Sequence, residues 1–171
     1  SLPFAGVTID LAAYKPPDRP AALAALAAAG FGWVRQRVDW GALEPQPGVY
    51  AWETTDAWLD AITAAGLAPL VVLDGSPAWA RAAQDRGAGD NPLAPPADNA
   101  DLAAFAAAFA ARYGDRVHFY QVWDEPNIAP HWGNRHIEPV AYAHLLGAAA
   151  AAIRAVDMDA VIVSAALAPT N

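Results

Sequence analysis

Residues 119–132 read "FYQVWDEPNIAPHW", an apolar and aromatic run that meets two adjacent acids, Asp124 and Glu125. The run predicts a buried strand over residues 116–123, with Pro126 directly after the acids. Taking a carboxylate out of water costs several kcal/mol or more unless the group is paired or used. Two acids at the end of a buried strand therefore indicate a chemical role.

The rest of the chain alternates strands and helices around this segment. The continuous apolar run "LAPLVVL" (67–73) is typical of a strand in a parallel sheet that is covered on both faces. Strands alternating with helices at this spacing predict right-handed βαβ units and a parallel sheet. The expected strands are 3–10, 32–38, 67–73, 116–123 and 160–167, and the expected helices are 18–30, 54–66, 99–114 and 138–156, with Thr54 or Thr55 capping the second helix.

Two α/β architectures fit this alternation: a doubly wound open sheet, or part of a TIM (β/α)8 barrel. A doubly wound nucleotide-binding sheet usually carries a glycine-rich turn after its first strand. Here that turn is "DLAAYKPPD" (10–18), which has no glycine. The missing glycine argues against a nucleotide site, and both architectures stay open here: either one predicts an α/β domain of five parallel strands and four intervening helices, with residues 1–171 as a single domain.

Acidic residues recur at the expected strand ends, where barrel enzymes place their chemistry. Asp10, Asp39 and Asp74 end the first three strands, and Asp124 with Glu125 ends the fourth. Aspartate also caps helices and turns routinely, which is a sufficient explanation of Asp39 and Asp74 taken singly. Glutamate is a poor cap, so Glu125 is the leading catalytic candidate.

Basic and aromatic residues gather near the same ends. Arg35 and Arg37 share one face of the second strand, where an arginine beside a carboxylate keeps it ionised and oriented; a surface ion pair is the alternative for Arg37. Tyr120 and Asn127 are weaker polar candidates. Aromatic residues at or just past strand ends are either platforms for sugar rings or large core side chains: Trp40, Trp79, Trp123 and Trp132.

Composition excludes several other classes of function. A formal net charge of −8 disfavours nucleic acid and anionic membranes, and the absence of cysteine excludes disulfides and thiol catalysis. No apolar run of about 18 residues is evident, so we expect no membrane insertion. The histidines lack ligand spacing, so we assign no metal and no cofactor. The residues begin "SLPFAG", a start that a removed signal peptide would also leave, and a cysteine-free chain fits either redox setting, so we expect the compartment to stay open.

The motif "VWDEPN" (122–127) resembles the W-N-E-P-N signature that ends the fourth strand of retaining (β/α)8 glycoside hydrolases of clan A. The likeness is closest to the β-xylosidase and α-iduronidase type. Residues 30–53, 60–80 and 141–169 resemble the family's second strand, third strand, and fourth helix with fifth strand. The resemblance implies a carbohydrate substrate, Glu125 as general acid/base, and Arg35 at the active-site arginine position.

Two departures from the family pattern qualify this expectation. Asp124 stands where the family normally has asparagine, and the nucleophilic glutamate of the seventh strand has no counterpart in these residues. We expect the N-terminal part of a catalytic barrel that is inactive alone. The alternative is a non-catalytic carbohydrate-binding or scaffolding module. Because the sheet would be unclosed, we also expect self-association through its edges.

Overall fold

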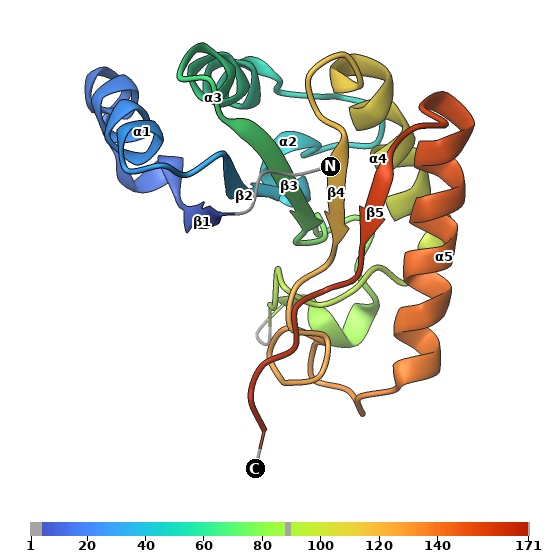
Figure 1. Cartoon of the computed structure of the whole chain (residues 1–171). Helices are drawn as coiled ribbons and strands as arrows, with labels where there is room; N and C mark the ends of the chain where they lie inside the picture. The colour runs from blue at the N-terminus through green and yellow to red at the C-terminus, as the bar shows by residue number, and fades with distance from the viewer. Residues whose placement is uncertain (1–4, 88–89, 171) are drawn as a thin grey trace.

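The computed structural model describes residues 5–87 and 90–170. Its five strands are all parallel and pair in sequence order, β1-β2-β3-β4-β5. In Figure 1 the arrows of β3, β4 and β5 point toward a common set of loops, which gather at the carboxyl ends of the strands. The strands are β1 (Gly6–Ile9), β2 (Trp33–Asp39), β3 (Ala68–Asp74), β4 (Phe119–Val122) and β5 (Val161–Val163).

The expected helices are all present. Glycines with positive φ follow two of them, Gly30 (φ 90°) and Gly66 (φ 74°), as left-handed residues that end helices do. The expected threonine cap is wrong: the residue before α3 is Trp52, and Thr55 is buried inside the helix. The helices are α1 (Arg19–Ala28), α2 (Trp40–Leu43, which was not expected), α3 (Glu53–Ala64), α4 (Asn99–Tyr113) and α5 (Pro139–Val156).

The two faces of the sheet differ in chemistry. On β2 the side chains of Val34, Gln36 and Val38 are buried, while Arg35 and Arg37 lie on the other face. The register places Arg35 beside Leu70 and Arg37 beside Val72. The first face forms the main core with the helices; its strand residues include Val7, Ile9, Val34, Val38, Val71, Leu73, Tyr120 and Val122.

Aromatic side chains on α4 join this core to the sheet. Phe105 stacks on Trp40 with ring centroids 5.4 Å apart, and Phe109 meets Tyr120 edge to face at 6.4 Å. Phe105 and Phe109 are almost fully buried. Burying such a ring stabilises the fold by about 1.5–3 kcal/mol, so these contacts fix β4 against its helices.

Most strand boundaries agree with those expected from the sequence. The fifth strand is shorter than expected, ending at Val163, the fourth begins at Phe119 instead of residue 116, and the first begins at Gly6. The predicted residues 3–4 lie outside the described part of the chain. Five parallel strands with intervening helices confirm the α/β class and fit part of a barrel.

The edges of the sheet are β1 and β5, and neither has a second strand partner among the described residues. In Figure 1, α1 lies on the β1 side and α5 on the β5 side. By length and composition alone, α5 is apolar enough to cross a membrane, although no such run was expected. One such helix is weak evidence, and only 17% of it is buried within this structure.

Candidate active site at the carboxyl ends of the strands

Arg35 binds the first of the two adjacent acids. Its Nη2 donates to Asp124 Oδ1 at 2.6 Å, and its Nε donates to Gln121 Oε1 at 2.9 Å. Gln121 in turn donates to Trp123 O and to Asp124 Oδ1. The side chains of Arg35 and Asp124 are 19% and 20% exposed, so this charged pair is largely shielded from water. Asp124 is therefore fixed at the end of β4 by an arginine from β2, which lies on the far side of β3.

Glu125 lies in an unusual backbone segment directly after β4. Its φ is 45°, and that of Trp123 is 68°, in the left-handed region that costs a non-glycine residue about 1–3 kcal/mol. The Glu125 amide donates to Ala166 O at 3.0 Å, which joins the segment to the chain after β5. Such strain is typical of functional sites, and here it sets the direction in which the Glu125 side chain leaves the strand end.

The Glu125 carboxylate is one-third exposed and has a histidine as its neighbour. His131 Nδ1 lies 3.5 Å from Glu125 Oε2. The acid is therefore accessible to a ligand and is not held in a strong ion pair. That combination suits a group that must exchange a proton with a substrate.

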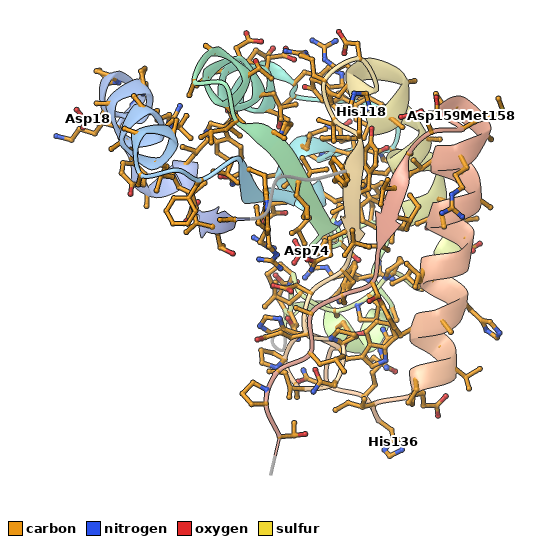
Figure 2. The ribbon with its side chains drawn as sticks, viewed as in Figure 1. Asp18, Asp74, His118, His136, Met158 and Asp159 are labelled. Atoms are coloured by element: carbon orange, nitrogen blue, oxygen red, sulfur yellow. The ribbon has the colours of Figure 1, made fainter. Side chains whose placement is uncertain are left out.

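A second cluster of charged side chains lies at the ends of β2 and β3. Arg37 Nε is 2.6 Å from Asp74 Oδ1, off the direction of a hydrogen bond, and Arg37 Nη1 is 3.6 Å from Asp39 Oδ2. Asp74 is 3% exposed. Burial raises the pKa of Asp74 to about 7, although Arg37 acts in the opposite direction. Figure 2 shows Asp74 at this end of the sheet and His118 at the other.

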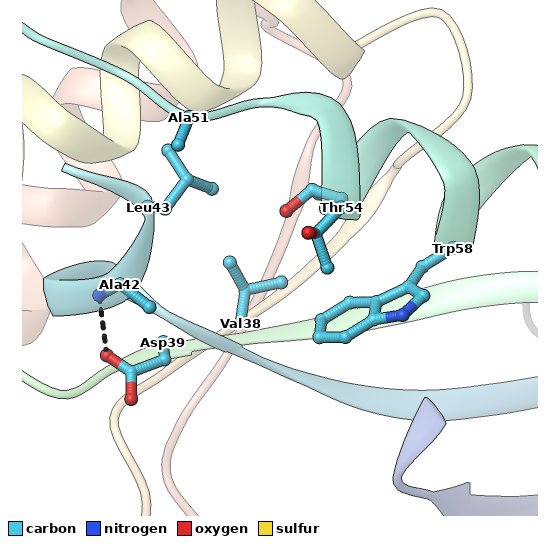
Figure 3. A pocket seen from close by; sticks show the side chains of 8 residues that line it. Val38, Asp39, Ala42, Leu43, Ala51, Thr54 and Trp58 are labelled. Atoms are coloured by element: carbon cyan, nitrogen blue, oxygen red, sulfur yellow. Dashed lines mark hydrogen bonds between the residues drawn. The ribbon is translucent and has the colours of Figure 1, made fainter. Parts of the chain in front are cut away.

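Asp39 also has a structural task. It caps α2, accepting a hydrogen bond from Ala42 N at 3.1 Å, as Figure 3 shows. This capping is the simple role that the sequence suggested for Asp39 alone. The residues drawn in Figure 3 line a cavity of about 130 Å³ between β2 and the helices α2 and α3, on the face away from Arg35.

The tryptophans do not all serve as expected. Trp123 and Trp132 are 1% and 3% exposed and pack edge to face with centroids 6.3 Å apart. Because both rings are buried, they have no free face for a sugar, and the expected substrate-binding role is corrected to a packing role. Trp79 is partly exposed, packs against Trp40 and donates to Glu44 O. Of these expected platforms, Trp79 alone keeps an accessible surface.

Asn127 is also engaged in the fold. Its Nδ2 donates to Ala168 O at 2.8 Å, and its Oδ1 accepts from Ala168 N at 2.9 Å. These two bonds join the β4–α5 loop to the segment after β5, so Asn127 braces the site, and its expected contact with substrate stays a prediction. Asp10 is exposed at the end of β1, where it accepts from Ala12 N at 3.0 Å.

Sequence reasoning missed Gln121 and His131 as neighbours of the two acids. Arg35 on β2 pairs with Leu70 on β3, and Gln121 on β4 pairs with Val72 on β3. Leu70 and Val72 are two residues apart and share a face of β3, so Arg35 and Gln121 lie on the same face of the sheet. The alternation of side chains along the strands was therefore sufficient to predict this neighbour. His131 lies six residues beyond Glu125 in an irregular loop, where no periodic pattern indicates its position.

One of the described cavities lies beside the ends of β4 and β5. A cavity of about 330 Å³ opens next to the Glu125 loop, and Glu125 is not one of the residues that line it. Its walls come from the β4–α5 loop, the start of α5 and the segment after β5: Pro126, Asn127, Ile137, Pro139, Tyr142, Ser164, Ala165 and Leu167.

No protein-family model matches the sequence, and no curated protein matches it. Many solved structures do. A family 39 glycoside hydrolase from Bacteroides cellulosilyticus WH2 is 23% identical with a TM-score of 0.71, over 92% of this chain and 31% of that one. A monomeric β-xylosidase from Caulobacter crescentus CB15 is 26% identical with a TM-score of 0.68, over 92% and 34%.

An exo-β-1,4-mannosidase from Opitutaceae bacterium strain TAV5 is 22% identical with a TM-score of 0.71, over 95% of this chain and 32% of that one. The chain thus spans about a third of the length of these structures. The matching structures include members of glycoside hydrolase families 39 and 5. The likenesses support a partial (β/α)8 barrel of the clan A glycoside hydrolases, without selecting one family among them.

Proposed function

We propose that this chain supplies the general acid/base of a retaining glycoside hydrolase, and that Glu125 is that residue. The observation that carries the proposal is the position of Glu125. It follows β4 in a strained segment, is one-third exposed, and lies next to an aspartate that Arg35 holds. The similarity to glycoside hydrolase structures over 92–95% of the chain supports the same role.

In this mechanism the Glu125 carboxyl acts twice. It first gives its proton to the glycosidic oxygen of the leaving group, and it then takes a proton from the water that attacks the glycosyl intermediate. Asp124, fixed by Arg35, accepts a hydrogen bond from a sugar hydroxyl. Arg37, Asp10 and Trp79 extend the binding surface over the ends of the first three strands.

A retaining reaction needs a second carboxylate about 5–5.5 Å from the first, acting as nucleophile. Asp124 is paired with Arg35, Asp74 with Arg37, and Asp39 caps α2. Each of these aspartates is therefore engaged. We infer that the nucleophile comes from outside these 171 residues, and that the 171-residue chain alone does not turn over.

The substrate is a carbohydrate, and β-xylosides and β-mannosides are the first to test. One structural neighbour is described as a β-xylosidase and another as an exo-β-1,4-mannosidase. The two sugars differ in the C2 hydroxyl configuration and in the C6 hydroxymethyl group, so a comparison reports on the contacts made at the strand ends.

The test is covalent labelling, which does not require the nucleophile. An N-bromoacetyl glycosylamine places its electrophilic carbon near the position of a glycosidic oxygen, and a carboxylate there displaces bromide to form an ester. We expect the xylosyl or mannosyl reagent to modify the chain once, at Glu125, by peptide mass spectrometry. Glu125→Gln should remove the label, whereas Glu138→Gln, in the following loop, should keep it.

Labelling of any other residue, or none at all, contradicts the acid/base role. Saccharide binding without labelling would favour the non-catalytic carbohydrate-binding module instead. Hydrolysis of an aryl glycoside by the 171-residue chain, lost in Glu125→Gln, would show that the inferred absence of a nucleophile is wrong.

A further inference from the structure

The His131 imidazole faces the proposed acid/base. Its Nδ1 is buried, lies 3.5 Å from Glu125 Oε2, and has no hydrogen-bond partner in the described part of the structure. A buried donor or acceptor without a partner costs about 1–3 kcal/mol. The carboxylate is the charged group next to it, and a small movement of either side chain completes the bond.

Buried contacts hold His131 in this position. Its backbone oxygen accepts a hydrogen bond from Trp123 Nε1 at 2.8 Å, and Trp123 is the residue that follows β4. On the preceding residue, Pro130 O accepts from Asn91 Nδ2 at 2.8 Å. On the following residue, Trp132 packs edge to face against Trp123. The histidine is therefore tied to the same strand end that presents Glu125.

A buried aspartate braces the loop from the other side. Asp85, which is fully buried, accepts from Asn134 N at 3.3 Å and forms an ion pair with Arg135. Asp85 belongs to the loop after β3, so two loops at the carboxyl ends of the strands are joined next to His131. Such anchoring is what a side chain needs in order to position another group.

We propose that His131 is a positioning residue for Glu125: its Nδ1–H donates to Oε2 and leaves Oε1 directed at the glycosidic oxygen. The inference rests on the proposed function, because it assigns a partner to the same carboxyl group. The bond also fixes the tautomer of His131, since a neutral imidazole that donates from Nδ1 carries its proton there.

The tautomer can be read without any saccharide. In ¹⁵N-labelled chain at pH 8, long-range nitrogen–proton spectra distinguish imidazoles protonated at Nδ1 from those protonated at Nε2. We expect His131 to be protonated at Nδ1, and Glu125→Ala to shift it to Nε2. His136 and His144, which are both exposed, should keep their signals, and the dispersion of the backbone amide signals checks that the variant is folded.

A matched pair of substitutions gives the second readout. The amide nitrogen of asparagine takes the place of Nδ1, whereas that of glutamine takes the place of Nε2. In labelling by the bromoacetyl glycosylamine, His131→Asn should retain most of the wild-type rate at Glu125. His131→Gln should lower the rate about tenfold, the effect of one hydrogen bond to a charged group.

The outcomes separate the two proposals. If the wild-type chain is not labelled at Glu125, the proposed function fails, and the tautomer spectrum still tests the contact. If Glu125 is labelled and the Asn and Gln variants react equally fast, the positioning role is contradicted while the proposed function stands. A His131 protonated at Nε2 in the wild-type chain also overturns the inference.

Discussion

At the scale of single residues, the pairing of Arg35 with Asp124 explains the departure from the W-N-E-P-N pattern. An asparagine would satisfy Gln121 but would leave the guanidinium without a countercharge. The aspartate accepts from Arg35 at 2.6 Å and from Gln121 at 3.1 Å. An aspartate at position 124 is therefore consistent with a site in which the charge of Arg35 on β2 is compensated by a carboxylate at the end of β4.

Replacing Arg35 by methionine tests this pairing. The variant leaves Asp124 and Gln121 partly buried without their donor, and we expect a loss of about 2 kcal/mol in the free energy of unfolding at pH 7. Asp124→Asn should cost about 1 kcal/mol, because a neutral acceptor remains. Urea denaturation measures both, and strictly additive losses in the double variant would show that the two residues are not coupled.

Asp74 gives the molecule a pH dependence of known sign. Its pKa is raised from 3.8 to about 7 by burial, so the folded state binds the proton more tightly than the unfolded state. The free energy of unfolding should therefore fall as the pH rises from about 4 to about 7, and the Asp74 contribution should be flat above that. This fall in the free energy of unfolding is on the order of 4 kcal/mol at most, and Asp74→Asn should remove it.

The measurement is urea denaturation of both proteins from pH 4 to pH 8. Other carboxylates titrate in both proteins, so the informative quantity is the difference between the two curves. Between pH 4 and pH 7 the free energy of unfolding of the wild-type chain should fall relative to that of Asp74→Asn. A constant offset across this range would mean that Asp74 titrates as an ordinary exposed carboxyl group.

At the scale of elements, strands and helices were predictable and loops were not. The continuous apolar segment 67–73 and the alternation of Arg35 and Arg37 on β2 follow from side-chain periodicity. The bracing of the two loops next to the site depends on Asp85, and no local pattern distinguishes it from a surface aspartate. For the same reason, Trp123 and Trp132 read equally well as binding platforms and as core residues.

Removing the brace should loosen the β4–α5 loop without unfolding the sheet. Asp85→Ala deletes the acceptor of Asn134 N and the partner of Arg135. We expect the amide of Asn134 to exchange with deuterium at least tenfold faster, while amides of β3 and β4 are unchanged. Asp115→Ala, which removes an exposed aspartate elsewhere, is the control. Unchanged exchange at Asn134 would contradict the bracing role.

At the scale of the whole molecule, the sheet has two edges where a closed barrel has none. Strand β5 is short, and Val161 on it is 46% exposed. Unpaired edges of this kind recruit other chains. The architecture therefore predicts association, either with further barrel strands or with a second copy.

We expect the 171-residue chain to self-associate with increasing concentration in light scattering. Val161→Lys places a charge at the edge strand and should weaken association about fivefold or more. Met158→Lys, at an 88% exposed position just before β5, should have little effect. A monodisperse monomer at high concentration would contradict this prediction.

The most direct test of the Glu125 assignment is a crystal structure of the chain with a bound xylo- or manno-oligosaccharide. A proton donor must lie within hydrogen-bond reach of the atom that it protonates, at about 3 Å. We predict a glycosidic oxygen at that distance from the Glu125 carboxylate, with an adjacent sugar hydroxyl on Asp124. A saccharide bound away from the carboxyl ends of the strands, or with every glycosidic oxygen out of reach of Glu125, would contradict it.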